Sequence, residues 1–119
     1  APYKTTFFGL YDRANSFDFK APFNLPARYA DNHDKLNLAT PFDFVTSNDV
    51  VGGNSGSPVI NRKGEIVGLV FDGNIESLVG DFVYDGATNR TVAVHTAAMT
   101  EALRKIYNAG ALLREILGE

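Results

Sequence analysis

The chain has 119 residues, a formal net charge of -3 and a hydrophobic content of 45%. This composition is typical of a folded chain rather than a disordered one, and the slightly acidic balance argues against a nucleic-acid-binding surface. Cysteine is absent, which excludes disulfides, thiolate metal sites and cysteine catalysis. No apolar run reaches the length of about 18 residues that a membrane span needs, and the first residues do not have the pattern of a signal peptide.

The N-terminal third predicts one strand followed by a long irregular connection. Residues 5–8 have the composition of a strand that ends at Gly9, and residues 11–37 contain two prolines and several Asn and Asp residues that interrupt every periodic pattern. A structureless connection of that length is unusual inside a compact domain. We therefore expect it either to be functional or to contact a part of the protein outside these residues.

The middle of the chain predicts β-structure, and its end predicts helix. Alternating or short apolar runs indicate strands over 42–47, 59–60, 65–71, 81–84 and 91–95. Between the second and third of these, Gly64 can take the left-handed conformation of a hairpin turn. From Thr96 the apolar period becomes helical, and Glu101 and Lys105 form an i, i+4 pair. We expect a mainly β fold, with strands and loops over 5–95 and a helical segment over 96–117.

A glycine-rich segment between two predicted strands carries the clearest chemical signal. Serine becomes a nucleophile only when a base takes its proton and hydrogen-bond donors stabilise the oxyanion that forms. In Gly53-Asn54-Ser55-Gly56, a tight turn could aim the amides of Gly53 and Ser55 at one point. We identify Ser55 as a candidate nucleophile and the Gly53 amide as a candidate oxyanion donor. The alternative is that residues 52–58 are merely a glycine-rich turn.

A second segment has the spacing of a substrate-binding strand. In the geometry that such a serine requires, an extended segment about 15 to 20 residues further along the chain pairs with the substrate backbone. Residues 69–74 lie at that distance, and Gly73 would leave a side pocket open.

The catalytic base is not evident within the chain. The two histidines are His33, in an Asn/Asp-rich loop close before the serine, and His95, after it. In the chymotrypsin order the histidine and the aspartate both precede the serine. Ser57 breaks the G-x-S-x-G pattern of α/β-hydrolases. We expect both histidines to be structural or solvent-exposed and the base to come from outside these residues. The aspartates show no metal-ligand spacing, so we expect no metal or cofactor.

With these motifs in view, the chain resembles the C-terminal part of the bacterial dipeptidyl-peptidase 7 and 11 family. The resemblance rests on residues 46–61 and 64–74, and it extends upstream through residues 23–26 and downstream through residues 89–95. It implies a chymotrypsin-like β-barrel, one half of a double barrel with an inserted helical domain. It also implies a periplasmic or cell-surface serine exopeptidase that releases dipeptides from peptides with free N-termini.

The resemblance also implies roles for single residues. Ser55 is then the nucleophile, and the amides of Gly53 and Ser55 form the oxyanion hole. Gly73 matches the position that sets the first pocket, where glycine goes with hydrophobic P1 side chains and arginine with acidic ones. Asp72 matches a position near the N-terminal amine of the substrate. The remaining substrate-binding positions of that block are Phe71 and Asn74. The family's catalytic histidine and aspartate lie far upstream, so this segment alone is expected to be inactive.

Two rival interpretations remain open at this point. The motif Gly-Asn-Ser-Gly-Ser-Pro also suits a glutamyl endopeptidase or a related trypsin-like protease. A non-catalytic interaction domain could keep the barrel without the chemistry. Half of a two-barrel enzyme should expose an apolar face, so the expected partners are a peptide substrate, the upstream half of the same protein and a second copy in a homodimer.

Overall fold

The structure is a computed structural model that describes residues 3–79 and 82–119. The chain divides into two compact units. The first, the sheet unit, is formed by residues 1–4 and 42–96. The second, the helical unit, is formed by residues 5–41 and 97–119. None of the described helices is long and apolar enough to cross a membrane.

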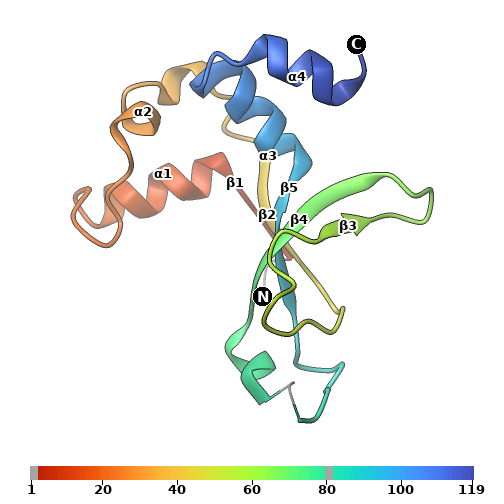
Figure 1. The fold of residues 1–119 in the computed structure, drawn as a ribbon. Coiled ribbons are helices and arrows are strands. Elements are labelled where there is room, and N and C mark those ends of the chain that lie inside the picture. The colour runs from red at the N-terminus through yellow and green to blue at the C-terminus, as the bar shows by residue number, and fades with distance from the viewer. Residues whose placement is uncertain (1–2, 80–81) are drawn as a thin grey trace. The chain divides into compact units, whose positions relative to one another are not determined.

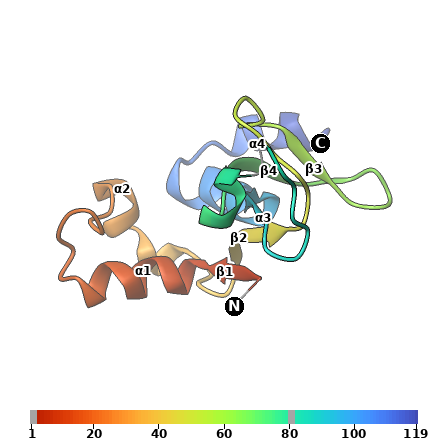
Figure 2. The same ribbon diagram turned by 90° about the horizontal axis from the view of Figure 1, so that it is seen from below.

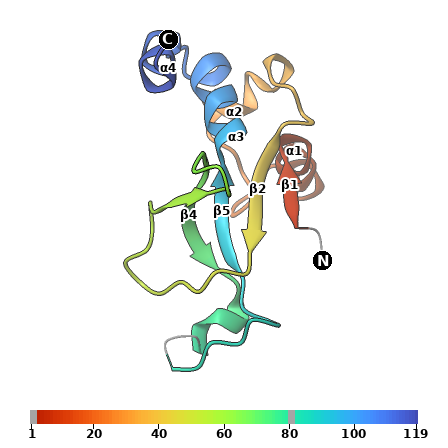
Figure 3. The same cartoon turned by 90° about the vertical axis from the view of Figure 1, so that its right-hand side faces the viewer.

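Five strands form one sheet in the order β1-β2-β5-β4-β3. They are β1 (Lys4–Thr6), β2 (Pro41–Thr46), β3 (Pro58–Ile60), β4 (Ile66–Gly73) and β5 (Thr91–His95). The pairs β2–β5, β4–β5 and β3–β4 are antiparallel, and Figure 3 shows β2, β5 and β4 side by side. Within the described residues β1 and β3 remain edges, so the sheet is open. A closed barrel, which we expected, would require every edge strand to pair.

A close approach of an aromatic ring to a glycine fixes the middle of the sheet. Gly68 on β4 is paired with His95 on β5. A Cβ atom at Gly68 would lie 2.5 Å from Cε1 of Phe44 and 2.7 Å from the carbonyl oxygen of Val94. Phe44 also makes an edge contact with His95, with 5.5 Å between ring centroids. Glycine at position 68 therefore makes room for an aromatic ring that belongs to β2.

Most of the predicted strands are confirmed. Strands cover the regions expected at 42–47, 59–60, 65–71 and 91–95, with small shifts at their ends. In the β3–β4 hairpin, Gly64 has a φ of 78°. The side-chain oxygen of Asn61 accepts hydrogen bonds from the amides of Lys63 and Glu65. The hairpin turn is thus formed as its sequence indicated.

The strand predicted at 81–84 is wrong for the residues that can be judged. Asp81 lies outside the described residues, and 82–84 form no strand. The connection from β4 to β5 instead contains the 3-10 helix η2 (Ile75–Val79) and a turn in which the Asp85 carboxylate accepts hydrogen bonds from Ala87 and Thr88. Phe82 is 90% exposed. Its apolar side chain, which suggested a buried strand, is therefore not packed in a core of this unit.

The helical unit contains elements from both ends of the chain. Its N-terminal helices are α1 (Phe7–Ser16), α2 (Ala27–Ala30) and the 3-10 helix η1 (His33–Lys35). Figures 1 and 2 show α1 and α2 joined by a loop. The C-terminal helices are α3 (Thr96–Glu101), the π-helix η3 (Ala102–Ile106) and α4 (Gly110–Leu117). A helical segment is therefore present over the expected range 96–117.

At the N-terminus the strand predicted over 5–8 is only partly right, and the irregular connection predicted over 11–37 is wrong. The strand ends at Thr6, and α1 begins at Phe7. Phe7, Tyr11 and Ala14 are the buried residues of this helix, and their i, i+4, i+7 spacing is that of one helical face. Burial of this face overrides the low helix propensity of Gly9, about 1 kcal/mol worse than alanine. The region 11–37 then continues with α2 and η1 rather than without structure.

The C-terminal helices contain the predicted ion pair. Glu101 and Lys105 lie 2.8 Å apart, and the Glu101 carboxylate also accepts a hydrogen bond from the amide of Asn37. The buried residues of α3 and η3 are Ala98, Ala102 and Ile106, whereas Tyr107 is 47% exposed. The π-helical turn between Ala102 and Ile106 shifts the helical register, which a regular helical period cannot anticipate.

Replacement of Gly68 by alanine should destabilise the sheet unit. The new methyl group would overlap Phe44 and the Val94 carbonyl, and overpacking of this kind costs about 1–3 kcal/mol. Gly9→Ala is the matched control, because no heavy atom lies within 4 Å of a Cβ there and alanine favours the helix. Urea unfolding should show a lower midpoint for Gly68→Ala and an equal or higher one for Gly9→Ala. Equal midpoints in both variants would refute the close contact.

Candidate active site

Two consecutive β-turns form the glycine-rich segment. The amide of Asn54 donates to the carbonyl of Val51 at 3.2 Å, and the amide of Ser57 donates to the carbonyl of Asn54 at 3.0 Å. The third residues of these turns are Gly53 and Gly56, with φ angles of 102° and 86°. A positive φ at the third position is what a type II turn demands, and glycine adopts it without a steric penalty. The two glycines thus follow from the turn geometry.

The end of this double turn is fixed to β4 by a reciprocal pair of hydrogen bonds. The amide of Gly56 donates to the carbonyl of Val70 at 2.7 Å, and the amide of Val70 donates to the carbonyl of Ser57 at 2.9 Å. The side-chain oxygen of Asn54 accepts a hydrogen bond from the amide of Val51 at 2.8 Å and closes the first turn. Ser55 is therefore held beside the C-terminal half of β4.

The turns leave main-chain donors free around Ser55. In a β-turn the two central amides make no turn hydrogen bond. Within the described part of the chain, the amides of Gly53 and Ser55 donate to no acceptor. The Ser55 side chain is exposed, and its hydroxyl has no hydrogen-bond partner among the described residues. The predicted nucleophile and its two candidate oxyanion donors are thus all available to a ligand.

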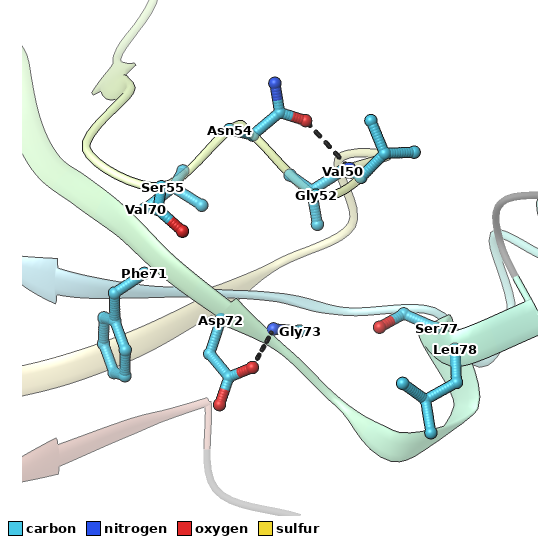
Figure 4. A pocket seen from close by; sticks show the side chains of 11 residues that line it. Val50, Gly52, Asn54, Ser55, Val70, Phe71, Asp72, Gly73, Ser77 and Leu78 are labelled. Atoms are coloured by element: carbon cyan, nitrogen blue, oxygen red, sulfur yellow. Dashed lines mark hydrogen bonds between the residues drawn. The ribbon is translucent and has the colours of Figure 1, made fainter.

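A pocket of about 220 Å³ lies between the double turn, β4 and η2. Figure 4 shows the side chains that line it. Three of the predicted substrate-binding residues, Phe71, Asp72 and Gly73, line this pocket together with Ser55. The other lining residues are Val50, Val51, Gly52, Asn54, Val70, Ser77 and Leu78. Two segments that are well separated in the sequence thus meet at one hollow of the sheet unit.

A β-bulge shapes the strand side of this pocket. The pairing of β4 with β5 shifts between Val70 and Asp72, so Phe71 is the extra residue of the bulge. Bulges re-aim side chains and are frequent beside active sites. Phe71 is 49% exposed, and the exposed Asp72 accepts a hydrogen bond from the amide of Gly73 at 2.8 Å. Asp72 forms no ion pair with any described residue, so its charge is available to a ligand.

Asn74, the remaining predicted substrate-binding residue, does not line the pocket. Its side-chain nitrogen donates to the carbonyl of Thr88 at 2.7 Å, and its side-chain oxygen accepts the amide of Arg90 at 2.8 Å. Its own amide donates to the carbonyl of Arg90 at 2.9 Å. Asn74 therefore joins the end of β4 to the beginning of β5 and positions η2, which is a structural role.

Neither histidine is among the residues that line the pocket. His33 makes an edge contact with Tyr11, at 5.2 Å between ring centroids, inside the helical unit. His95 contacts Phe44 in the sheet unit. Desolvation, together with the positive charge of Lys4, lowers the pKa of His95 below its usual value. His33 is exposed and His95 is half-buried, and each histidine ring makes an edge contact with one aromatic ring.

Sequence reasoning missed the part of the pocket that η2 and the preceding loop contribute. Val50 and Val51 precede the double turn, and Ser77 and Leu78 belong to η2. The sequence signal for this part of the pocket was the pair Ile75 and Leu78, apolar residues three apart that follow Gly73. In the structure both side chains are more than 70% exposed. Among the described residues, no group of three or more His, Cys, Asp or Glu side chains could hold a metal ion.

Solved structures with the same fold place this geometry in a known structural class. The chain superimposes on a crystal structure of DPP11 from Porphyromonas endodontalis in complex with the dipeptide Arg-Glu, with a TM-score of 0.83 and 24% sequence identity. The match covers 98% of this chain and 18% of that one. The antiparallel sheet and its helices therefore form part of the DPP11 fold.

The sequence comparisons define the family. The family model described as Peptidase S46 matches residues 1–118. A dipeptidyl-peptidase 7 from Capnocytophaga gingivalis is 40% identical over 100 residues, which are 77% of this chain and 14% of that protein. An Asp/Glu-specific dipeptidyl-peptidase from Shewanella putrefaciens is 38% identical over 78 residues, 66% of this chain and 11% of that protein. The chain belongs to the Peptidase S46 family and spans about one seventh of the length of the first of these relatives.

Alanine substitutions in the double turn should distinguish the effect of a strained backbone conformation from the effect of steric crowding. No heavy atom lies within 4 Å of a Cβ built at Gly52, Gly53 or Gly56, but only the last two have a positive φ. Gly53→Ala and Gly56→Ala should each lower the free energy of unfolding by about 1–2 kcal/mol, since a Cβ is strained in that conformation. Gly52→Ala should have little effect. Equal losses in all three variants, measured by chemical denaturation, would contradict the turn assignment.

Proposed function

We propose that this chain is the nucleophile-bearing, C-terminal part of a chymotrypsin-type serine dipeptidyl-peptidase. The observation that carries the proposal is the exposed Ser55 hydroxyl, on a double turn that leaves the amides of Gly53 and Ser55 free, at the rim of a pocket. Membership in the Peptidase S46 family supports it. The open sheet of this chain would be completed into a barrel by the rest of a longer polypeptide.

The proposed reaction is acyl transfer through Ser55. A histidine from the upstream part of the polypeptide, oriented by an aspartate, takes the hydroxyl proton while the oxygen attacks the scissile carbonyl carbon. The carbonyl oxygen becomes an oxyanion that the amides of Gly53 and Ser55 stabilise, and each such donor contributes about 3–4 kcal/mol. The C–N bond then breaks, and the histidine returns the proton to the leaving amine. Water hydrolyses the acyl-enzyme, with no metal or cofactor in the scheme.

Release of dipeptides requires recognition of the free N-terminus of the substrate. Asp72 supports this part of the proposal, because it lies on the pocket wall, is exposed and has no cationic partner among the described residues. A carboxylate that meets an ammonium group forms a charge-assisted hydrogen bond, which is about twice as strong as a neutral one. We assign Asp72 to amine binding.

The composition of the pocket supports a hydrophobic P1 side chain. Its lining includes the apolar residues Val50, Val70 and Leu78, and none of its described lining residues is Arg, Lys or His. Gly73 adds no side chain that could reach an acidic P1 group. The names of the relatives do not decide the question, because they include both dipeptidyl-peptidase 7 and Asp/Glu-specific enzymes. The assignment to hydrophobic P1 residues therefore rests on the pocket.

Location and partners complete the proposal. We place the enzyme in the periplasm or at the bacterial cell surface, where oligopeptides are its substrates. Several large apolar side chains of the sheet unit that do not line the pocket are exposed, among them Ile75, Phe82 and Val83. Surfaces of this kind are typical of protein interfaces. We expect the upstream half of the same polypeptide to cover them, or a second copy in a homodimer.

Two rival functions share the same motif. A glutamyl-endopeptidase-like protease would use the same serine on internal bonds, and a non-catalytic barrel would not use it at all. The free carboxylate of Asp72 beside the pocket favours the exopeptidase.

Acetylation of the substrate N-terminus should discriminate the exopeptidase from the endopeptidase. The acetyl group removes the positive charge that Asp72 is proposed to bind, so hydrolysis of peptides should fall about 10- to 100-fold, the order of one lost interaction with a charged group. Chromatography of the products measures the released dipeptide. Equal rates on free and acetylated peptides would favour the endopeptidase.

A fluorophosphonate reagent should label Ser55 in the longer polypeptide but not in the 119-residue chain alone. The upstream histidine is needed to activate the hydroxyl. Ser55→Ala should abolish the labelling and lower kcat by about a millionfold, whereas Ser57→Ala, two residues away, should still be labelled. Mass spectrometry locates the modified residue. A longer polypeptide that is folded but not labelled would support the non-catalytic barrel.

A further inference from the structure

The residue at the end of β4 and a residue of η2 occupy the same space. A Cβ atom built at Gly73 would lie 2.3 Å from the Oγ atom of Ser77, 3.4 Å from its Cβ atom and 3.6 Å from the carbonyl oxygen of Arg90. Only the first of these distances is too short, because the other two are ordinary van der Waals contacts. Any residue other than glycine at position 73 therefore requires the Ser77 hydroxyl to move.

The Ser77 hydroxyl is not free to move without cost. It donates a hydrogen bond to the carbonyl of Asn74 at 2.6 Å, and the amide of Ser77 donates to the same carbonyl at 3.0 Å. Asn74 is in turn attached to Thr88 and Arg90 through its side chain. The first turn of η2 is thus tied to the beginning of β5. A larger side chain at position 73 has to displace the hydroxyl, because the helix itself is held.

The next residue of η2 contributes the apolar part of the same wall. Leu78 lines the pocket and is 74% exposed. Figure 4 shows Ser77 and Leu78 together on η2, beyond Asp72 and Gly73 along the chain. An apolar ligand side chain in the pocket would remove part of the Leu78 surface from water, which stabilises the bound state by roughly 25 cal/mol per Å².

We propose that η2 is a specificity-determining element of the pocket, with Leu78 as its apolar wall and Ser77 as the residue that restricts position 73 to glycine. The inference rests on the proposed peptidase function and deepens it. The pocket accepts an apolar P1 side chain because both positions act together. An acidic-selective pocket, with arginine at position 73, then requires the loss of the hydroxyl at position 77 as well.

The steric part of the inference is tested by a double-mutant cycle in the longer polypeptide. Gly73→Ala should lower the melting temperature and reduce kcat/KM for substrates with leucine at P1 about tenfold or more. Ser77→Ala removes the Oγ atom and leaves the Cβ atom at a tolerable distance, so the double variant should recover most of both losses. Coupling of this kind is expected for residues in contact. Additive effects, or a Gly73→Ala variant without any loss, would overturn the coupling.

The specificity part is tested with Leu78→Ala. It should reduce kcat/KM for leucine and phenylalanine at P1 about 10- to 100-fold, the range for lost apolar contacts in a pocket, and change it little for alanine at P1. Ile66→Ala is the matched control, since Ile66 is an aliphatic residue of β4 that is 57% exposed and does not line this pocket. Gly73→Arg should favour aspartate at P1 only when combined with Ser77→Ala.

The outcomes separate the two levels of the proposal. Fluorophosphonate titration gives the fraction of active Ser55 in each variant, so kcat/KM is compared per active site. If Leu78→Ala is fully labelled but keeps its preference for large apolar P1 residues, the role of η2 is refuted while the peptidase function stands. If the unaltered polypeptide is folded but neither labelled nor active, the proposed function fails, and the melting temperatures of the cycle still decide the contact between positions 73 and 77.

Discussion

The reciprocal hydrogen bonds between the double turn and Val70 are the constraint on which the candidate site depends. They tie Gly56 and Ser57 to a buried residue of the central part of β4. Main-chain hydrogen bonds contribute only about 0.5–1.5 kcal/mol each, but these two fix a register. Because Ser55 immediately precedes this anchor, its hydroxyl lies beside the strand residues that follow Val70. The bulge at Phe71 then directs that strand along the pocket.

A second set of hydrogen bonds builds the opposite side of the pocket. Asn74 joins the end of β4 to the start of β5 and supplies the carbonyl that accepts both the amide and the hydroxyl of Ser77. The pocket is thus bounded by a turn and by a short helix, each attached to the same strand. Its shape follows from main-chain bonding, whereas its chemistry follows from the side chains that line it, those of Asp72 and Leu78 among them.

The sequence indicated the local turns of the site because several glycines in a short segment are typical of turns that need a positive φ angle. Gly53 and Gly56 mark positive φ angles, and the hairpin at Asn61 and Gly64 follows the same logic. Gly73 also lies at the distance along the chain from Ser55 that was expected of a substrate-binding strand, and the two residues line one pocket; their roles stay predictions. These predictions concern neighbours along the chain or adjacent strands, where backbone geometry leaves few alternatives.

The remaining features depend on tertiary contacts that local patterns do not encode. Phe7 begins a helix because its face is buried, although Thr5-Thr6-Phe7-Phe8 has the composition of a strand. The region after Gly73 contains apolar residues that are exposed in the sheet unit, so their pattern indicated a strand that the described residues do not form. Asn74 was assigned to the substrate because it belongs to the block that resembles the family. Its observed partners Thr88 and Arg90 lie 14 and 16 residues away along the chain, where a local pattern does not indicate them.

The central claim is that two main-chain amides beside Ser55 bind the oxygen that becomes negative during acyl transfer. A crystal structure of the longer polypeptide after reaction with a fluorophosphonate measures this directly. We expect a phosphorus atom bonded to the Ser55 oxygen and a phosphoryl oxygen about 2.7–3.1 Å from the amide nitrogens of Gly53 and Ser55. A phosphoryl oxygen directed into solvent, or amides engaged by other main-chain carbonyls, would contradict this claim.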